Sequence, residues 1–225
     1  MSTATSTVRP VLVAGSWRDA DYQKTFRATD PNSNEPIPVD FPVSSWEDCD
    51  AALDAAVDAA RELRRLPRHQ IAEFLERYAD RIDAAKDALV EAAFRETGLA
   101  KSPRLADVEL PRTSNQLRAA AAACRSGSWA LPTIDTAAGI RSCYESIGPV
   151  CLFGPNNFPF AFCSVSGGDY AATIAAGNPV IGKANSSQPE TTRLFAQQAA
   201  AAIKETGLPP ATLQMIYRTS HSDGE

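Results

Sequence analysis

Apolar positions divide the chain into short runs typical of strands and longer stripes typical of helices. Two short runs, Val150–Phe153 and Val180–Ile181, flank an Ala-rich segment of helix length. A third run follows at Leu213–Tyr217, after a helical pattern over Pro189–Thr206. Strands that alternate with helices favour parallel pairing, so we expect an α/β fold with three neighbouring parallel strands and helices packed on them.

Two further strand patterns lie near the N-terminus, at Val11–Trp17 and Lys24–Ala28. Turn-forming residues follow them at 30–34, with the sequence D-P-N-S-N. We expect an edge hairpin or meander here. Near residue 137, A-A-G is a turn sequence, and the alternation over Ile140–Glu145 is typical of an exposed ribbon.

Four helical patterns occupy residues 45–124, and we expect them to pack as one layer. Ser45 with Asp48 resembles a capping box at the start of the first. Gly98 ends the third, and Pro111 kinks or breaks the fourth, which begins at about Pro103. The expected buried stripes of the first three are Trp46, Cys49, Leu53, Val57 and Ala60; Ile71, Phe74, Leu75, Tyr78 and Ile82; and Leu89, Val90, Ala93 and Phe94.

Composition places the chain among ordinary globular proteins, with 44% hydrophobic and 22% charged residues in 225. The net charge of −5 argues against a nucleic-acid partner. The N-terminal sequence lacks the apolar core of a signal peptide, and no apolar run is long enough to span a bilayer. We therefore expect a cytoplasmic location and no membrane partner.

Five cysteines and two histidines lack the spacing of a zinc site or a disulfide framework, so we expect no metal. Cys151 lies in an expected buried strand, and Cys49 and Cys124 lie on apolar helical faces. Cys143 falls in the ribbon, and Cys163 falls in the helix expected after the first parallel strand.

The first parallel strand leads into G-P-N-N-F-P at residues 154–159, at the sheet edge where ligands bind α/β folds. If the next helix begins there, with Pro159 in its first turn, Asn157 is an N-cap residue. Gly167 and Gly168 would then lie about two turns into that helix. Without a surrounding G-x-G-x-x-G they indicate close packing rather than phosphate binding.

These motifs resemble the aldehyde dehydrogenase superfamily, whose proline-x-asparagine-phenylalanine-proline motif is similar to G-P-N-N-F-P. A-A-G-N-P-V-I-G-K, ending at Lys183, resembles the family's alanine-glycine-asparagine run. Further segments resemble the α-ketoglutaric semialdehyde dehydrogenase branch: F-G-P-N-N-F-P-F-A-F, S-G-G-D, R-T-S-N-Q-L-R from Arg112, and G-S-W from Gly127. The resemblance covers nearly the whole chain.

The resemblance implies the amino-terminal portion of such an enzyme, with a truncated Rossmann-type parallel sheet, a preceding helical layer and a β-ribbon. Residues 1–130 would form the hairpin and helical layer of the cofactor-binding domain. Residues 131–146 would form the ribbon of the oligomerisation element, and residues 147–225 the first βαβαβ part of the dinucleotide-binding domain. The full-length form would be a homo-oligomer.

For Asn157 the resemblance implies a second role, since the family's asparagine donates its side-chain amide to the oxyanion of the tetrahedral intermediate. This role competes with helix capping for the same side chain. The family's lysine at the position of Lys183 binds the cofactor ribose. The implied cofactor-binding residues are Phe153, Gly154, Pro155, Asn156, Lys183, Ala184 and Ser186.

Many family members carry a glutamate at the position of Ser186, where its charge repels the 2′-phosphate of NADP. The uncharged Ser186 removes this repulsion, and Lys183 supplies the opposite charge. We therefore expect NADP as well as NAD to be accepted. Arg104 and Arg112 could face a carboxylate-bearing substrate, although two arginines on a helix more often form a solvated face.

The implied function is NAD(P)-dependent oxidation of an aldehyde, a semialdehyde such as 2,5-dioxovalerate, to its carboxylic acid as part of a longer enzyme. The alternative is a truncated, inactive dinucleotide-binding or subunit-interaction module. None of the five cysteines resembles the family's nucleophile, and the general-base glutamate is not found either. We expect residues 1–225 alone to show no turnover and to expose an apolar edge at the third strand.

Overall fold

The computed structural model describes residues 8–219, and its centre is a five-stranded sheet in the order β2-β1-β11-β10-β9. The prediction of three neighbouring parallel strands is confirmed, because β10 pairs in parallel with both β9 and β11. The strands are β1 (Val11–Val13), β2 (Ser16–Arg18), β9 (Val150–Phe153), β10 (Val180–Lys183) and β11 (Leu213–Ile216).

The N-terminal hairpin differs in detail from its prediction. The expected single strand over residues 11–17 is broken at Ala14 and Gly15, whose φ angles of 52° and 75° reverse the chain into β2. Gly15 is needed there for a second reason, because a Cβ atom would lie 2.3 Å from the Cβ of Pro210. An edge hairpin is present, but it forms within the first expected strand. The second expected strand, observed at Tyr22–Phe26, pairs with Phe41–Ser44 in another sheet, so the two expected strands do not pair with each other.

The expected open edge at the third parallel strand is wrong. Strand β1 pairs antiparallel with β11, with Leu12 opposite Met215, and β2 then forms the edge of the sheet. The sheet is therefore mixed, and its other edge is β9. Cys151 on β9 is exposed for this reason, contrary to its expected burial.

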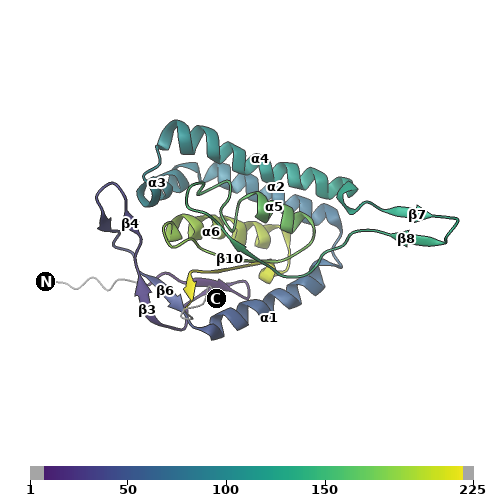
Figure 1. Cartoon of the computed structure of the whole chain (residues 1–225), viewed down its shortest axis with the longest axis horizontal. Coiled ribbons are helices and arrows are strands. Elements are labelled where there is room, and N and C mark those ends of the chain that lie inside the picture. The colour runs from purple at the N-terminus through teal and green to yellow at the C-terminus, as the bar shows by residue number, and fades with distance from the viewer. Residues whose placement is uncertain (1–7, 220–225) are drawn as a thin grey trace.

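Helices cover both faces of the sheet, so the prediction of one four-helix layer is also wrong (Figure 1). Helix α1 (Trp46–Leu63) packs on one face, against β1, β10 and β11. On the opposite face, α5 (Gly168–Ala175) and α6 (Pro189–Thr206) contact the sheet, and an outer layer packs on them. That layer consists of α2 (Arg68–Ala84), α3 (Lys86–Thr97) and α4 (Leu110–Ser126).

The buried face of α1 is rotated from its predicted stripe. Trp46, Leu53 and Val57 are at least 38% exposed, whereas the helix buries Cys49, Ala52, Ala56, Ala59, Ala60 and Leu63. Alanine side chains let the helix lie close to the sheet, which explains why the largest apolar residues do not mark the buried face. The predicted stripe of α2 is buried throughout, as are Leu89, Val90 and Ala93 of α3.

The predicted capping box of α1 is wrong. The Ser45 side chain makes no capping hydrogen bond, and Asp48 instead accepts from Asp21 N at 3.1 Å and pairs with Arg18 at 2.7 Å. Gly98 does end α3, in the left-handed conformation. A π-helix over Lys101–Glu109 runs directly into α4, and Pro111 lies in the first turn of α4. The type of helix therefore changes next to Pro111, but Glu109 and Leu110 keep right-handed helical backbone angles, so the chain does not break there.

Smaller strands complete the fold. The predicted ribbon consists of β7 (Thr133–Asp135) and β8 (Ile140–Ser142), and it projects from the body of the molecule (Figure 1). A second sheet contains β3 (Tyr22–Phe26), β6 (Phe41–Ser44) and β12 (Arg218–Thr219), and β4 (Thr29–Asp30) pairs with β5 (Glu35–Pro36). Short 3₁₀ turns lie at Ser128–Ala130 and Pro210–Thr212. Within residues 8–219, no helix combines the length and apolar character needed to cross a membrane.

Candidate active site

The segment after β9 is an irregular loop rather than the start of a helix. Helix α5 begins only at Gly168, with Gly167 at its N-cap position. The prediction that Asn157 caps a helix, with Pro159 in its first turn, is therefore wrong. Cys163 accordingly lies in this loop and not in a helix. We call residues 154–167 the asparagine loop.

Close packing explains the path of this loop. A Cβ atom on Gly167 would lie 2.7 Å from both the Ala161 carbonyl oxygen and the Phe162 Cα, and Gly168 N donates to Ala161 O at 3.0 Å. The loop thus folds back on itself where only glycine fits. The two glycines were predicted two turns into a helix, which is wrong, but their interpretation as close-packing residues is confirmed.

A buried carboxylate holds the middle of the asparagine loop. Glu109 is 1% exposed, and its Oε1 accepts hydrogen bonds from Phe160 N at 2.8 Å and Ala161 N at 3.0 Å. Its other oxygen pairs with the Arg104 guanidinium, which also donates to Asn157 O at 2.9 Å. Arg104 is therefore tied to the loop, and its interpretation as a member of a solvated face is wrong.

The Asn157 side chain remains available for a ligand. Asn157 is exposed, and within residues 8–219 its side-chain amide makes no hydrogen bond, although its carbonyl oxygen is held by Arg104. Asn156 and Asn157 line a cavity. Its other lining residues are Thr29 of β4, Pro31 directly after β4, Glu96 and Thr97 at the end of α3, Leu99 and Ser187. A free amide on a held backbone has the form of a pre-organised hydrogen-bond donor.

The three parallel strands end in register at the same edge of the sheet. Lys183 is opposite Phe153 on one side and Ile216 on the other, so the asparagine loop and the segment after β10 leave the sheet side by side. Phe153 is 74% exposed. Burial, with a smaller effect of the nearby Arg218 charge, lowers the pKa of Lys183.

Side-chain amides connect the two segments. Asn185 Nδ2 donates to Gly154 O at 2.9 Å, and the buried Gln188 donates through Nε2 to Pro155 O at 3.0 Å. Gly154 is packed so closely that a Cβ atom would lie 2.8 Å from Phe162 O. Ala184 is buried, and its N–H donates to Ile216 O. Of the expected cofactor-binding residues, Gly154 and Ala184 thus have clear structural roles.

Ser186 has a cationic neighbour that the sequence analysis missed. Arg218 Nε donates to Ser186 Oγ at 3.0 Å, and the same guanidinium lies over the Phe26 ring, 4.5 Å from its centroid. The missed signal is positional: Arg218 comes two residues after β11, at the edge where Lys183 ends β10. Lys183, Ser186 and Arg218 together form a basic corner of the site.

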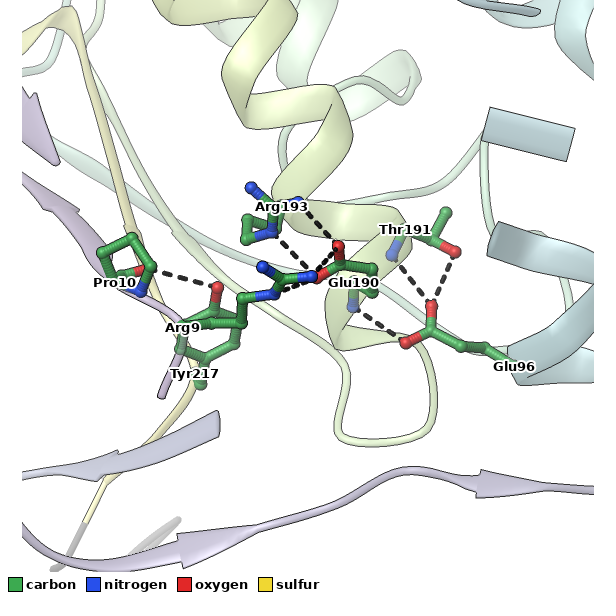
Figure 2. A network of polar contacts seen from close by, with 7 residues as sticks. All are labelled: Arg9, Pro10, Glu96, Glu190, Thr191, Arg193 and Tyr217. Atoms are coloured by element: carbon green, nitrogen blue, oxygen red, sulfur yellow. Dashed lines mark hydrogen bonds and ion pairs between the residues drawn. The ribbon is translucent and has the colours of Figure 1, made fainter. Parts of the chain in front are cut away.

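A second buried carboxylate holds the start of α6, beside the same cavity. Glu96 accepts from Glu190 N and Thr191 N at 2.8 Å each and from Thr191 Oγ1 at 2.7 Å (Figure 2). The cations in this network, Arg9 and Arg193, pair with Glu190 instead. Desolvation, to which the Glu190 charge adds a little, raises the pKa of Glu96 to about 7.

Three of the five cysteines have buried thiols, namely Cys49, Cys124 and Cys163. All five are free. Burial raises the pKa of the Cys49, Cys124 and Cys163 thiols, which favours their protonated form over the nucleophilic thiolate. Cys163 lies in the asparagine loop, but it is 2% exposed and its Sγ faces Thr192 Oγ1 at 3.8 Å.

Residues 17–225 match the aldehyde dehydrogenase family. Among curated relatives, α-ketoglutaric semialdehyde dehydrogenase 2 of Azospirillum brasilense is 40% identical over 91% of this chain. The α-ketoglutaric semialdehyde dehydrogenase of Acinetobacter baylyi is 34% identical over 89%. The chain spans 40% and 39% of the lengths of these two relatives.

Solved structures share the fold. Aldehyde dehydrogenase 21 of Physcomitrella patens, in complex with its product succinate, superposes with a TM-score of 0.80 over 98% of this chain and 45% of its own, at 22% identity. Aldehyde dehydrogenase C of Pseudomonas syringae, complexed with NAD⁺ and octanal, gives the same TM-score over 97% of this chain and 42% of its own, also at 22% identity. The family match over residues 17–225, together with this shared fold, shows that the chain belongs to the aldehyde dehydrogenase family.

Proposed function

We propose that the protein carrying this chain oxidises an aldehyde to its carboxylic acid with NAD(P), and that its substrate is a semialdehyde such as 2,5-dioxovalerate. Family membership and the semialdehyde dehydrogenases among the relatives support this proposal. The observation that carries it is the exposed Asn157 amide at the carboxyl edge of three parallel strands, on a backbone held by Arg104.

Asn157 would donate its amide N–H to the aldehyde oxygen as negative charge develops on it. Because Arg104 and Glu109 already hold the loop, this donor needs little reorganisation when the substrate reacts. NAD(P), when bound, would accept the hydride that the aldehyde carbon loses. We propose that the nucleophilic thiol comes from a part of the protein outside this chain, because the buried cysteines here favour the protonated form.

The basic corner would hold the ribose of the cofactor. Lys183 and Arg218 bring two positive charges to a site where Ser186 brings no negative one. A 2′-phosphate could accept hydrogen bonds from both cations and from the Ser186 hydroxyl. The proposed enzyme therefore accepts NADP at least as well as NAD.

The ribbon of β7 and β8 would belong to the oligomerisation element. It projects from the body, and its side chains are exposed, including Ile134 and Ile140 at 66% and 58%. Residues 1–130 and 147–225 would form the cofactor-binding domain on either side of it. Exposed apolar residues on a projecting ribbon are consistent with a contact between subunits of the full-length homo-oligomer.

Asn157→Ala in the complete protein tests the proposed activity. Loss of the amide should lower kcat by about a hundred- to a thousandfold, as loss of a single oxyanion donor does in other enzymes. The measurement is the formation of reduced cofactor from a panel of semialdehydes. Asn115→Ala is the control, because Asn115 is an exposed asparagine on α4.

Full activity of Asn157→Ala would contradict the assigned role of Asn157. Cofactor binding by the wild type without any aldehyde oxidation would instead favour the alternative of an inactive dinucleotide-binding module.

Ser186→Glu tests the cofactor assignment. The new carboxylate would repel a 2′-phosphate and pair with Arg218, so kcat/KM for NADP should fall about 10- to 100-fold while that for NAD is retained. Ser187→Glu places the same charge on the next, exposed residue and controls for position. Equal losses with both cofactors would show that Ser186 does not face the 2′-phosphate.

A further inference from the structure

Arg112 differs from the other arginines of α4 in having no anionic partner. Arg118 pairs with Asp80 and Asp83 at 2.8 and 2.7 Å, and Arg125 pairs with Glu76. Within the described part of the chain, exposed Arg112 forms no hydrogen bond or ion pair. Its positive charge is therefore uncompensated by any neighbouring side chain.

Aromatic rings of the asparagine loop hold this free cation in place. The Arg112 guanidinium lies 5.0 Å from the Phe162 ring centroid and 5.7 Å from that of Phe158, and the two rings are themselves in edge contact. A cation–π contact uses the face of the guanidinium and the ring. It leaves the fork of N–H donors at the guanidinium edge free to bind a planar anion.

The free cation is close to the proposed oxyanion donor. Phe158 directly follows Asn157, and Arg104 lies over the same ring at 4.5 Å while donating to the Asn157 carbonyl oxygen. The charge of Arg104 is offset by buried Glu109. Arg112 is thus the cation beside Asn157 that has capacity for a ligand.

We propose that Arg112 binds the distal carboxylate of the substrate whose aldehyde oxygen Asn157 receives. It is then a specificity-determining residue that selects aldehydes carrying a second, anionic end, with Phe158 and Phe162 packing against the carbon chain between the two ends. This inference rests on the proposed function. A bidentate guanidinium–carboxylate pair supplies both charge and orientation.

The test compares glutarate semialdehyde with pentanal, which has the same carbon chain without the carboxylate, in the complete protein. Arg112→Gln should lower kcat/KM for glutarate semialdehyde about 10- to 100-fold, mainly through KM, and leave pentanal oxidation unchanged. Arg112→Lys should recover part of the loss, because it keeps the charge but not the fork. Arg118→Gln is the matched control and should change neither rate.

An equal loss with both aldehydes, or no loss with either, would overturn the assignment of Arg112. If the wild type oxidises neither these two aldehydes nor any semialdehyde of the panel, the proposed function is wrong, and the subsite is then judged by calorimetric titration with glutarate. Binding at least about tenfold weaker in Arg112→Gln than in the wild type supports the subsite. Equal binding, or none in either protein, overturns it.

Discussion

Two buried carboxylates, Glu109 and Glu96, hold two segments of the candidate site in nearly the same way. Each accepts two backbone N–H groups, from the middle of the asparagine loop in the case of Glu109 and from the start of α6 in the case of Glu96. The two carboxylates differ in the further partner that each one contacts. Glu109 pairs with the Arg104 cation, whereas Glu96 receives only the neutral hydroxyl of Thr191.

The difference shows that similar hydrogen bonding does not give the same electrostatic environment. The two arginines of this network, Arg9 and Arg193, form hydrogen bonds with the side-chain carboxylate of Glu190 and not with Glu96 (Figure 2). Glu96 therefore carries the cost of burial without a counter-charge, and its pKa is raised to about 7. The asparagine loop, which carries the proposed oxyanion donor, is held by the paired carboxylate.

Removing the paired carboxylate should have the largest effect. Glu109→Ala leaves the Arg104 charge without its partner and two buried N–H groups without an acceptor, so the free energy of unfolding should fall by about 3–5 kcal/mol. Urea unfolding measures this change. Glu76→Ala removes an exposed partner of Arg125 and should cost at most about 1 kcal/mol. Similar losses of unfolding free energy in the two variants would show that burial does not strengthen the contribution of the Glu109–Arg104 pair to stability.

The second largest effect should be a pH dependence of protein stability caused by the unpaired carboxylate of Glu96. The folded-state pKa of Glu96, about 7, lies above its ordinary value of 4.5, so the folded protein binds more protons than the unfolded chain between these pH values. The free energy of unfolding should therefore fall as the pH rises through this window, by at most about 3 kcal/mol from this group.

Comparison with Glu96→Gln isolates that contribution, since glutamine does not titrate. The unfolding free energy of the wild type minus that of the variant should decrease from pH 5 to pH 8. A difference that stays constant over this range would mean that the buried carboxylate is not the group responsible.

Removing one donor to Glu96 should have the smallest effect. Thr191→Val keeps the side-chain shape but removes the hydroxyl that donates to Glu96 Oε2, and it should cost about 1.5 kcal/mol in thermal or urea unfolding. Thr206→Val is a suitable control, because the Thr206 hydroxyl donates only to carbonyl oxygens of its own helix. Equal costs would indicate that charge on Glu96 adds nothing to the Thr191 hydrogen bond.

The fold could be predicted where one periodic signal dominated. Runs of β-branched and other apolar residues marked β9, β10 and β11, and large apolar residues at helical spacing marked the buried face of α2. The face of α1 could not be predicted in the same way, because alanines rather than Leu53 and Val57 pack on the sheet. The pairing of β1 with β11 depends on contacts far apart in sequence, which local patterns do not contain.

The candidate site was predictable where a residue follows a strand. The order of the strands placed Lys183 and Asn157 at one edge of the sheet, and the resemblance to the family supplied their expected roles. The residues that support the site were not predicted. Glu109 and Arg104 contact the asparagine loop only because that loop folds back toward them, and local sequence patterns do not encode this path. Only the structure separates the paired Arg104 from the unpaired Arg112, although the two share one sequence segment.

The pairing of β1 with β11 also has a consequence for the order of events during synthesis. Ala14 N donates to Gln214 Oε1 at 2.7 Å, 200 residues further along the chain, and Tyr217 donates its hydroxyl hydrogen to Pro10 O. The first hairpin to leave the ribosome must therefore wait for nearly all of this chain before its partner strand exists. Such long-range closure slows folding, and the waiting strands are exposed to other chains meanwhile.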